Sequence, residues 1–192
     1  VFMFWVLAHN IFYPYIVPFR VPSGVAGKAD LVLLVLGIAA LGGIGLTGML
    51  VDHALRATFL VSLAVFAGVC AVYTVCASFP SVVWAGVTVW GLTFGGAATL
   101  LQTALADAAG KGADVALSMN VVAWNSAIAG GGLLGGVLLN LYGASSLAWV
   151  MLGLLGCGFG IALLACSNGF RAGHRLVHGP QDGRQNSADF TS

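Results

Sequence analysis

Long apolar stretches follow one another along this chain, and short segments between them carry the polar and charged residues. A helix that crosses a bilayer needs roughly 20 mostly apolar residues, because the hydrocarbon offers no water to the backbone. The pattern therefore predicts an all-α integral membrane protein with a bundle of six transmembrane helices over residues 1–167. The predicted spans cover about residues 1–19, 30–50, 57–78, 82–106, 115–140 and 146–167.

Composition agrees with a lipid environment. The chain is 59% hydrophobic and only 7% charged, with a mean hydropathy of +1.00, whereas a soluble domain carries roughly 25% charged residues. A net charge of +1 provides no basic surface for nucleic acid. Residues 168–192 are polar, and we expect them to form a disordered cytoplasmic tail.

The positive charges predict an orientation. Cytoplasmic loops carry an excess of Lys and Arg, which places both ends of this multi-pass protein in the cytoplasm, in a plasma or inner cell membrane. The chain begins with Val1 and has no secretory leader. We expect a fragment of a longer protein, with translation from a non-ATG codon as the alternative. The side expected to be cytoplasmic carries Arg56, Lys111, Arg171, Arg175 and Arg184, and the other carries Arg20 and Lys28.

The sequence gives little indication of a metal site or of a hydrolytic active site. The four cysteines lie in apolar runs without Cys-x-x-Cys spacing, so we expect packing or lipid-facing roles and no cofactor. Glu is absent, which excludes a His-Glu-x-x-His helix, and no Ser stands in a Gly-x-Ser-x-Gly context. An intramembrane enzyme is therefore a poor candidate.

Polar side chains within the spans are candidates for ligand binding, because each is costly in lipid unless it is paired or wetted. The alternative for each is an interhelical hydrogen bond, worth about 0.6 kcal/mol on average. We favour that alternative for Gln102 and Asn120. Pro14 and Pro18 weaken the first span, which would suit a gating helix. The residues predicted to bind substrate are His9, Asn10, Tyr13, Tyr15, Trp90, Trp124 and Asn125.

Glycines at four-residue spacing predict close helix packing in the fifth span. Gly131 with Gly135, and Gly132 with Gly136, would let two helix backbones approach closely. Such pairs pack helices in any membrane bundle, but glycine-rich faces would also allow helices to slide or rock.

The segment after the second span carries Gly48-x-Leu50-x-Asp52, with Arg56 following. It resembles the cytoplasmic loop motif of the major facilitator superfamily, although His53 and Leu55 replace the usual basic residue and glycine. The resemblance implies that Gly48, Asp52 and Arg56 form a conformational latch. An ordinary polar turn with a capping Asp is the alternative.

Further resemblance covers about residues 1–167. AHNIFYPYIVPF in the first span is similar to the seventh helix of drug:proton antiporters and arabinose-efflux permeases, and residues 91–139 resemble their tenth and eleventh helices. The resemblance implies the carboxyl-terminal half of a twelve-helix fold, whose partner is a six-helix amino-terminal half and whose substrate lies between the halves. It implies proton-coupled efflux of a small organic compound such as a drug, sugar or nucleoside.

Proton coupling needs a titrating group, yet no carboxylate lies deep in a span, since Asp30, Asp52, Asp107 and Asp114 are all near predicted ends. The proton carrier therefore lies in the amino-terminal half, or His9 carries the proton. A six-helix permease or half-transporter that works as a homodimer is the alternative. The pattern leaves the substrate open.

Overall fold

The computed structural model describes residues 1–19, 23–24 and 26–164, which leaves the predicted tail, the end of the sixth span and Arg20 outside the described residues. The described residues form helices and turns without a β-strand. The elements in chain order are α1 (Phe2–Phe12), η1 (Tyr13–Tyr15), α2 (Ile16–Phe19), η3 (Ala26–Lys28), α3 (Ala29–Cys76), α4 (Pro80–Gly95), α5 (Ala97–Ala109), η4 (Gly110–Gly112), α6 (Ala113–Tyr142) and α7 (Ser145–Leu164), where η marks a 3-10 turn.

Among the described residues, four continuous helical segments are long and apolar enough to cross a membrane. Two of them hold 48 and 63 residues, more than twice the roughly 20 that one crossing requires. The prediction of an all-helical protein is confirmed, and the number of crossings stays a prediction. The segments are Phe2–Phe19, Ala29–Cys76, Pro80–Tyr142 and Ser145–Leu164.

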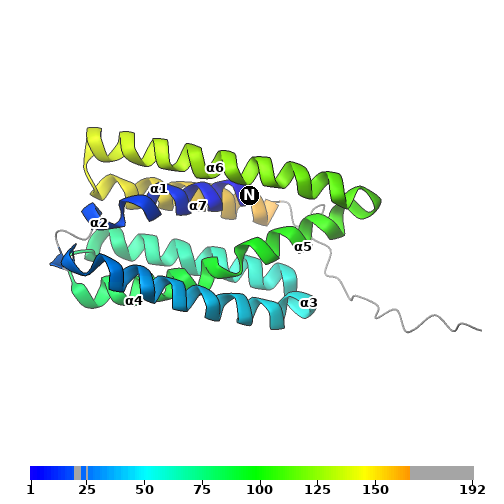
Figure 1. Cartoon of the computed structure of the whole chain (residues 1–192), viewed down its shortest axis with the longest axis horizontal. Coiled ribbons are helices and arrows are strands. Elements are labelled where there is room, and N and C mark those ends of the chain that lie inside the picture. The colour runs from blue at the N-terminus through cyan, green and yellow to red at the C-terminus, as the bar shows by residue number, and fades with distance from the viewer. Residues whose placement is uncertain (20–22, 25, 165–192) are drawn as a thin grey trace, which may run out of the picture.

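Helix α3 consists of two helices joined at a kink. Ala54 has φ −146° and ψ 41°, which are not helical angles, and the chain reverses direction there (Figure 1). The kink falls between the predicted second and third spans. The polar segment predicted to be a loop is therefore largely helical, with its turn at Ala54.

Contacts with α4 confirm this reversal. In the second half of α3, the Tyr73 hydroxyl donates to the Val83 carbonyl at 3.1 Å, and the Phe66 ring stacks on Trp90 with centroids 5.9 Å apart. The residue numbers fall along α3 as they rise along α4, so these two helices are antiparallel.

The first half of α3 packs against α4 through small residues. A Cβ atom on Gly91 would lie 2.6 Å from the Leu36 carbonyl oxygen, and one on Gly96 would collide with the Thr47 side chain. Here the numbers rise along both helices, so they run parallel. Backbones this close require glycine on one side, because any Cβ would clash.

Two helical segments are interrupted. The first span breaks at η1, where Pro14 has no N–H to donate and forces a 3-10 turn. The predicted fourth span, residues 82–106, breaks at Gly96, which separates α4 from α5. Paired glycines are a common cause of kinks, and here Gly95 and Gly96 supply them.

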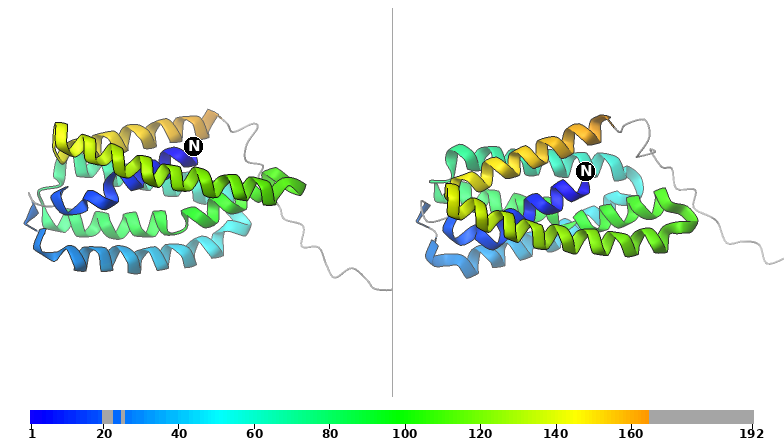
Figure 2. Two further views of the ribbon diagram at one scale, coloured as in Figure 1. Left: turned by 45° about the horizontal axis from the view of Figure 1, so that its top comes forward. Right: turned by 90° about the horizontal axis from the view of Figure 1, so that it is seen from above.

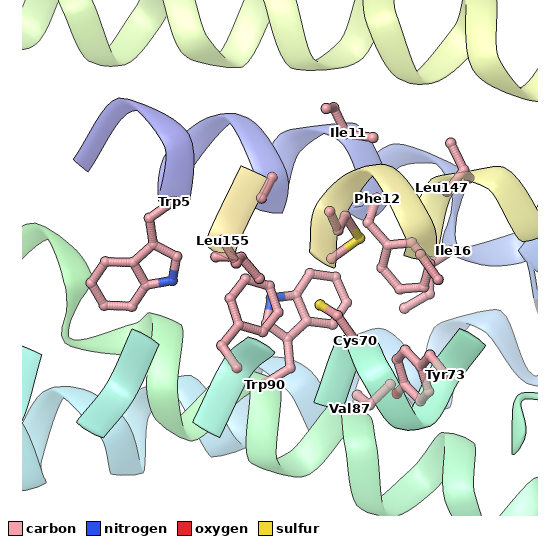
Figure 3. Packing of buried hydrophobic residues seen from close by; sticks show 14 of the residues in the cluster. Trp5, Ile11, Phe12, Ile16, Cys70, Tyr73, Val87, Trp90, Leu147 and Leu155 are labelled. Carbon is pink, nitrogen blue, oxygen red and sulfur yellow. The ribbon is translucent and has the colours of Figure 1, made fainter. Parts of the chain in front are cut away.

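The core lies between α1, the second half of α3, α4 and α7. Trp5 and Trp90 are fully buried, and Figure 3 shows both lying between α1 and the ribbons of α3 and α4, with Leu155 of α7 near them. Helix α6 lies against α1 as an outer rod (Figure 2), and its buried residues are the small ones Ala127, Gly131 and Gly135.

Large apolar side chains also cover the outside of the bundle. Ile38 is 61% exposed, Met119 69% and Leu133 72%. An apolar surface of this extent is unfavourable in water and suits a hydrocarbon environment. The turn within α3 and the connection from α5 to α6 lie at one end of the bundle, and the start of α3 lies at the other (Figure 1). By sequence position, Arg56 follows the turn in α3, Lys111 belongs to η4 between α5 and α6, and Lys28 directly precedes α3.

Candidate functional site

A hydrogen bond between α1 and α4 lies at the centre of the candidate site. The Trp90 indole Nε1–H donates to Nδ1 of His9 with an N···N distance of 3.1 Å. The Trp90 side chain is fully buried, whereas His9 is partly exposed. Both residues were predicted to bind substrate, and the buried Trp90 therefore holds the partly exposed His9 in place.

The bond determines which nitrogen of neutral His9 carries the proton. The indole nitrogen can only donate, so Nδ1 must accept and the hydrogen lies on Nε2. The Nε2–H group has no partner among the described residues, so it is available to donate to a ligand acceptor.

Aromatic rings enclose His9 from both helices. The His9 ring lies flat on Phe94, with centroids 3.6 Å apart and an interplanar angle of 6°. Tyr13, one helical turn later and the first residue of η1, has its ring centroid 5.3 Å from that of His9 at an interplanar angle of 15°, and it is 42% exposed. Phe94 also contacts Trp124 of α6 with centroids 6.4 Å apart. We call His9, Tyr13, Trp90, Phe94 and Trp124 the aromatic cluster.

The cluster unites four of the seven residues predicted to bind substrate, and the other three make different contacts. Asn10 donates to the Val6 carbonyl at 2.8 Å, and Asn125 donates to Val121 at 2.8 Å from an exposed position on α6. Both amides are thus bonded within their own helix. The Tyr15 hydroxyl donates to the Gly132 carbonyl at 2.7 Å and ties the first span to α6.

The predicted glycines form the interface between α6 and the first span. A Cβ atom on Gly131 would lie 2.6 Å from the Cβ of Asn10, and one on Gly136 would lie 2.7 Å from the Tyr15 hydroxyl oxygen. Gly135 also faces Tyr15. Gly132 has open space where a Cβ would be, so its contribution here is the backbone carbonyl.

The predicted latch residues lie around the turn of α3. Gly48 has nothing within 4 Å of a built Cβ, Asp52 is exposed and Arg56 is partly buried. Gly48 therefore makes no close helix contact within the described chain. The glycine contacts with α4 lie earlier in α3, where a Cβ on Gly43 would collide with the Leu92 carbonyl oxygen.

The sequence did not single out Trp5. It contacts Phe94 edge-on with centroids 5.8 Å apart, and its buried Nε1–H has no hydrogen-bond partner among the described residues. Spacing offered a signal, since Trp5 and His9 lie four residues apart and share a helical face. The described residues contain no group of three potential metal ligands.

No family model, curated protein or solved structure matched this chain. Its function must therefore be inferred from its own residues.

Proposed function

We propose that this chain is one half of a secondary transporter that moves a small organic compound across a cell membrane, with the aromatic cluster as part of its substrate site. The observation that carries the proposal is the position of the cluster between two interrupted helices. His9 lies one helical turn before the break at Tyr13–Tyr15, and Phe94 lies two residues before the break at Gly96. Transporters commonly build their sites from discontinuous helices near the bilayer midplane.

The proposed topology has six crossings with both ends in the cytoplasm. The reversal of α3 at Ala54 and the turn at Gly110–Gly112 would divide the two longest segments into two crossings each. These two turns lie at the same end of the bundle (Figure 1), and Arg56 beside the first and Lys111 in the second support a cytoplasmic assignment for that end. The resemblance of Gly48, Asp52 and Arg56 to a major facilitator loop agrees with this orientation.

The His9–Trp90 bond suggests how proton binding would act on the site. A proton on Nδ1 turns that atom from an acceptor into a donor, and it can then no longer accept from Trp90. Protonation would therefore separate a side chain of α1 from one of α4. In the proposed cycle this change, or one in an amino-terminal half, biases alternating access.

Transport into inverted membrane vesicles under an imposed pH gradient tests the proposal. Radiolabelled uridine, arabinose and chloramphenicol represent the nucleoside, sugar and drug classes. We expect uptake of at least one compound, and we expect His9→Ala to reduce that uptake at least about fivefold with normal membrane insertion. Tyr142→Phe, at a 69% exposed position on α6, is the control.

The assay should use both the whole reading frame that contains this chain and the chain alone. Uptake only by the whole protein supports a half-transporter, while uptake by the chain alone supports the homodimer. Uptake that persists unchanged in His9→Ala removes the aromatic cluster from the substrate site.

A further inference from the structure

A second site lies beside the aromatic cluster. A cavity of about 420 Å³ is lined by residues from the start of α1, from α5 and from the first turns of α6. This volume is within the range of roughly 300–1,000 Å³ that is typical of small-molecule sites. Its lining includes Met3, Leu101 and Met119, and it contains no charged side chain.

Asn120 is the one amide in this lining. Its side chain has no hydrogen-bond partner among the described residues, whereas Asn10 and Asn125 each donate to a carbonyl four residues earlier. An amide held among apolar groups is costly unless it is hydrogen-bonded. Its polar atoms are not fully enclosed by protein, because Trp5 supplies the only enclosed, unpaired side-chain atom in the described chain. The amide is therefore available to a ligand.

Trp124 lies at the boundary of the two sites. It lines the cavity, one helical turn after Asn120, and its ring also contacts Phe94 of the aromatic cluster. Its indole Nε1–H likewise has no partner within the described part of the chain, so it offers a second donor. The cavity thus combines apolar walls, an aromatic ring and two adjacent polar groups.

We propose that this cavity binds a neutral, mainly apolar small molecule through one carbonyl or hydroxyl group that hydrogen-bonds to Asn120. The α-amino group of Val1 also lines the cavity; once it is acetylated, no charged group in the lining would compensate the loss of hydration of an ion, so the cavity selects against ions. Because Asn120 and Trp124 lie one helical turn apart in the lining, a ligand bonded to Asn120 would contact the Trp124 ring. The proposal requires the helical bundle but does not require transport, so it can stand or fall independently of the proposed function.

Benzophenone is a suitable probe because it is neutral, aromatic and has a single carbonyl group. Under near-ultraviolet light its carbonyl oxygen abstracts hydrogen from a nearby C–H group, and the two carbon radicals combine, which labels the residue in contact. The detergent-solubilised full chain is irradiated with benzophenone and the labelled residue is located by mass spectrometry after chymotryptic digestion. We expect the label at Met119 and other lining residues of the cavity.

Two variants and two charged probes give the matched comparisons. Asn120→Leu removes the amide at similar size, and Ala123→Phe fills the cavity; each should lower labelling at the cavity at least about fivefold. Asn140→Leu, at an exposed position on α6 outside the lining, should leave it unchanged. Benzophenones that carry a trimethylammonium or a carboxylate group should label the cavity at least about fivefold less.

Several results would overturn the inference. One is equally strong labelling of the apolar groove lined by Val65, Val72 and Val89, which would indicate partition into detergent. A second is undiminished labelling in Asn120→Leu, and a third is equally strong labelling by a charged probe. A fourth is a competition experiment in which hexadecane, which has no carbonyl group, displaces benzophenone as readily as acetophenone does. Cavity labelling in a protein that transports none of the three compounds would overturn only the proposed function.

Discussion

Substitution of Gly131 by Ala tests the contact between α6 and α1. The added Cβ would lie 2.6 Å from the Cβ of Asn10 and 2.9 Å from its carbonyl carbon. Carbon atoms prefer separations of about 3.5–4.0 Å. Both atoms are fixed by the backbone of α1, so the two helices must move apart by about 1 Å.

Gly132→Ala is the matched control for this substitution. It lies one residue further along the same helix and has nothing within 4 Å of a built Cβ. Both substitutions gain the same preference of about 1 kcal/mol for Ala over Gly in a helix. The difference between the two variants in the free energy of unfolding therefore measures the cost of overpacking at Gly131, which is about 1–3 kcal/mol. That range corresponds to a factor of about 5–150 in the unfolding equilibrium.

The free energy of unfolding can be measured by titrating detergent-solubilised protein with sodium dodecyl sulfate and following helicity by circular dichroism. We expect Gly131→Ala to unfold at a lower mole fraction of denaturing detergent than the wild type, and Gly132→Ala at an equal or higher one. Equal stability of the two variants would refute the close packing of α6 on α1.

Three further experiments test single contacts. A double-mutant cycle of Trp90→Phe and His9→Leu, followed by the same titration, should give a coupling free energy of about 1–2 kcal/mol, and zero coupling would exclude the Trp90–His9 bond. Tyr15→Phe should cost about 0.5–1.5 kcal/mol through loss of the bond to Gly132, whereas Tyr142→Phe at an exposed position should cost nothing. Gly96→Ala should lower the thermal unfolding temperature, and adding Thr47→Ala should restore part of it; no restoration would show that the clash lies elsewhere.

Apolar patterning predicted the helices well, because the length and hydropathy of a span are local properties of the chain. The positions of the turns were also largely foreseeable, since the segments around Ala54 and Lys111 carry the charges that interrupt the apolar runs. The break at Gly96 was not predicted, because glycine inside a membrane helix can be a kink or a packing surface. Only the collision with Thr47 shows that it serves both roles.

Part of the candidate site could be predicted from the sequence. Helical spacing placed His9 and Tyr13 on one face, as the stacked rings confirm. The His9–Trp90 bond joins residues 81 positions apart, and no local pattern determines such a pairing. The sequence predicted ligand binding for Asn10 and Asn125, yet both amides bond to their own helices. It favoured an interhelical hydrogen bond for Asn120, which instead lines the cavity and has no hydrogen-bond partner among the described residues.

The turn of α3 at a single non-helical residue has a consequence for biosynthesis. The two halves of α3 are joined at Ala54 without a separate loop between them. In the proposed topology, the insertion machinery would therefore receive them in immediate succession. A ribosome stalled shortly after Ala54 would have delivered the first of these proposed crossings without the second.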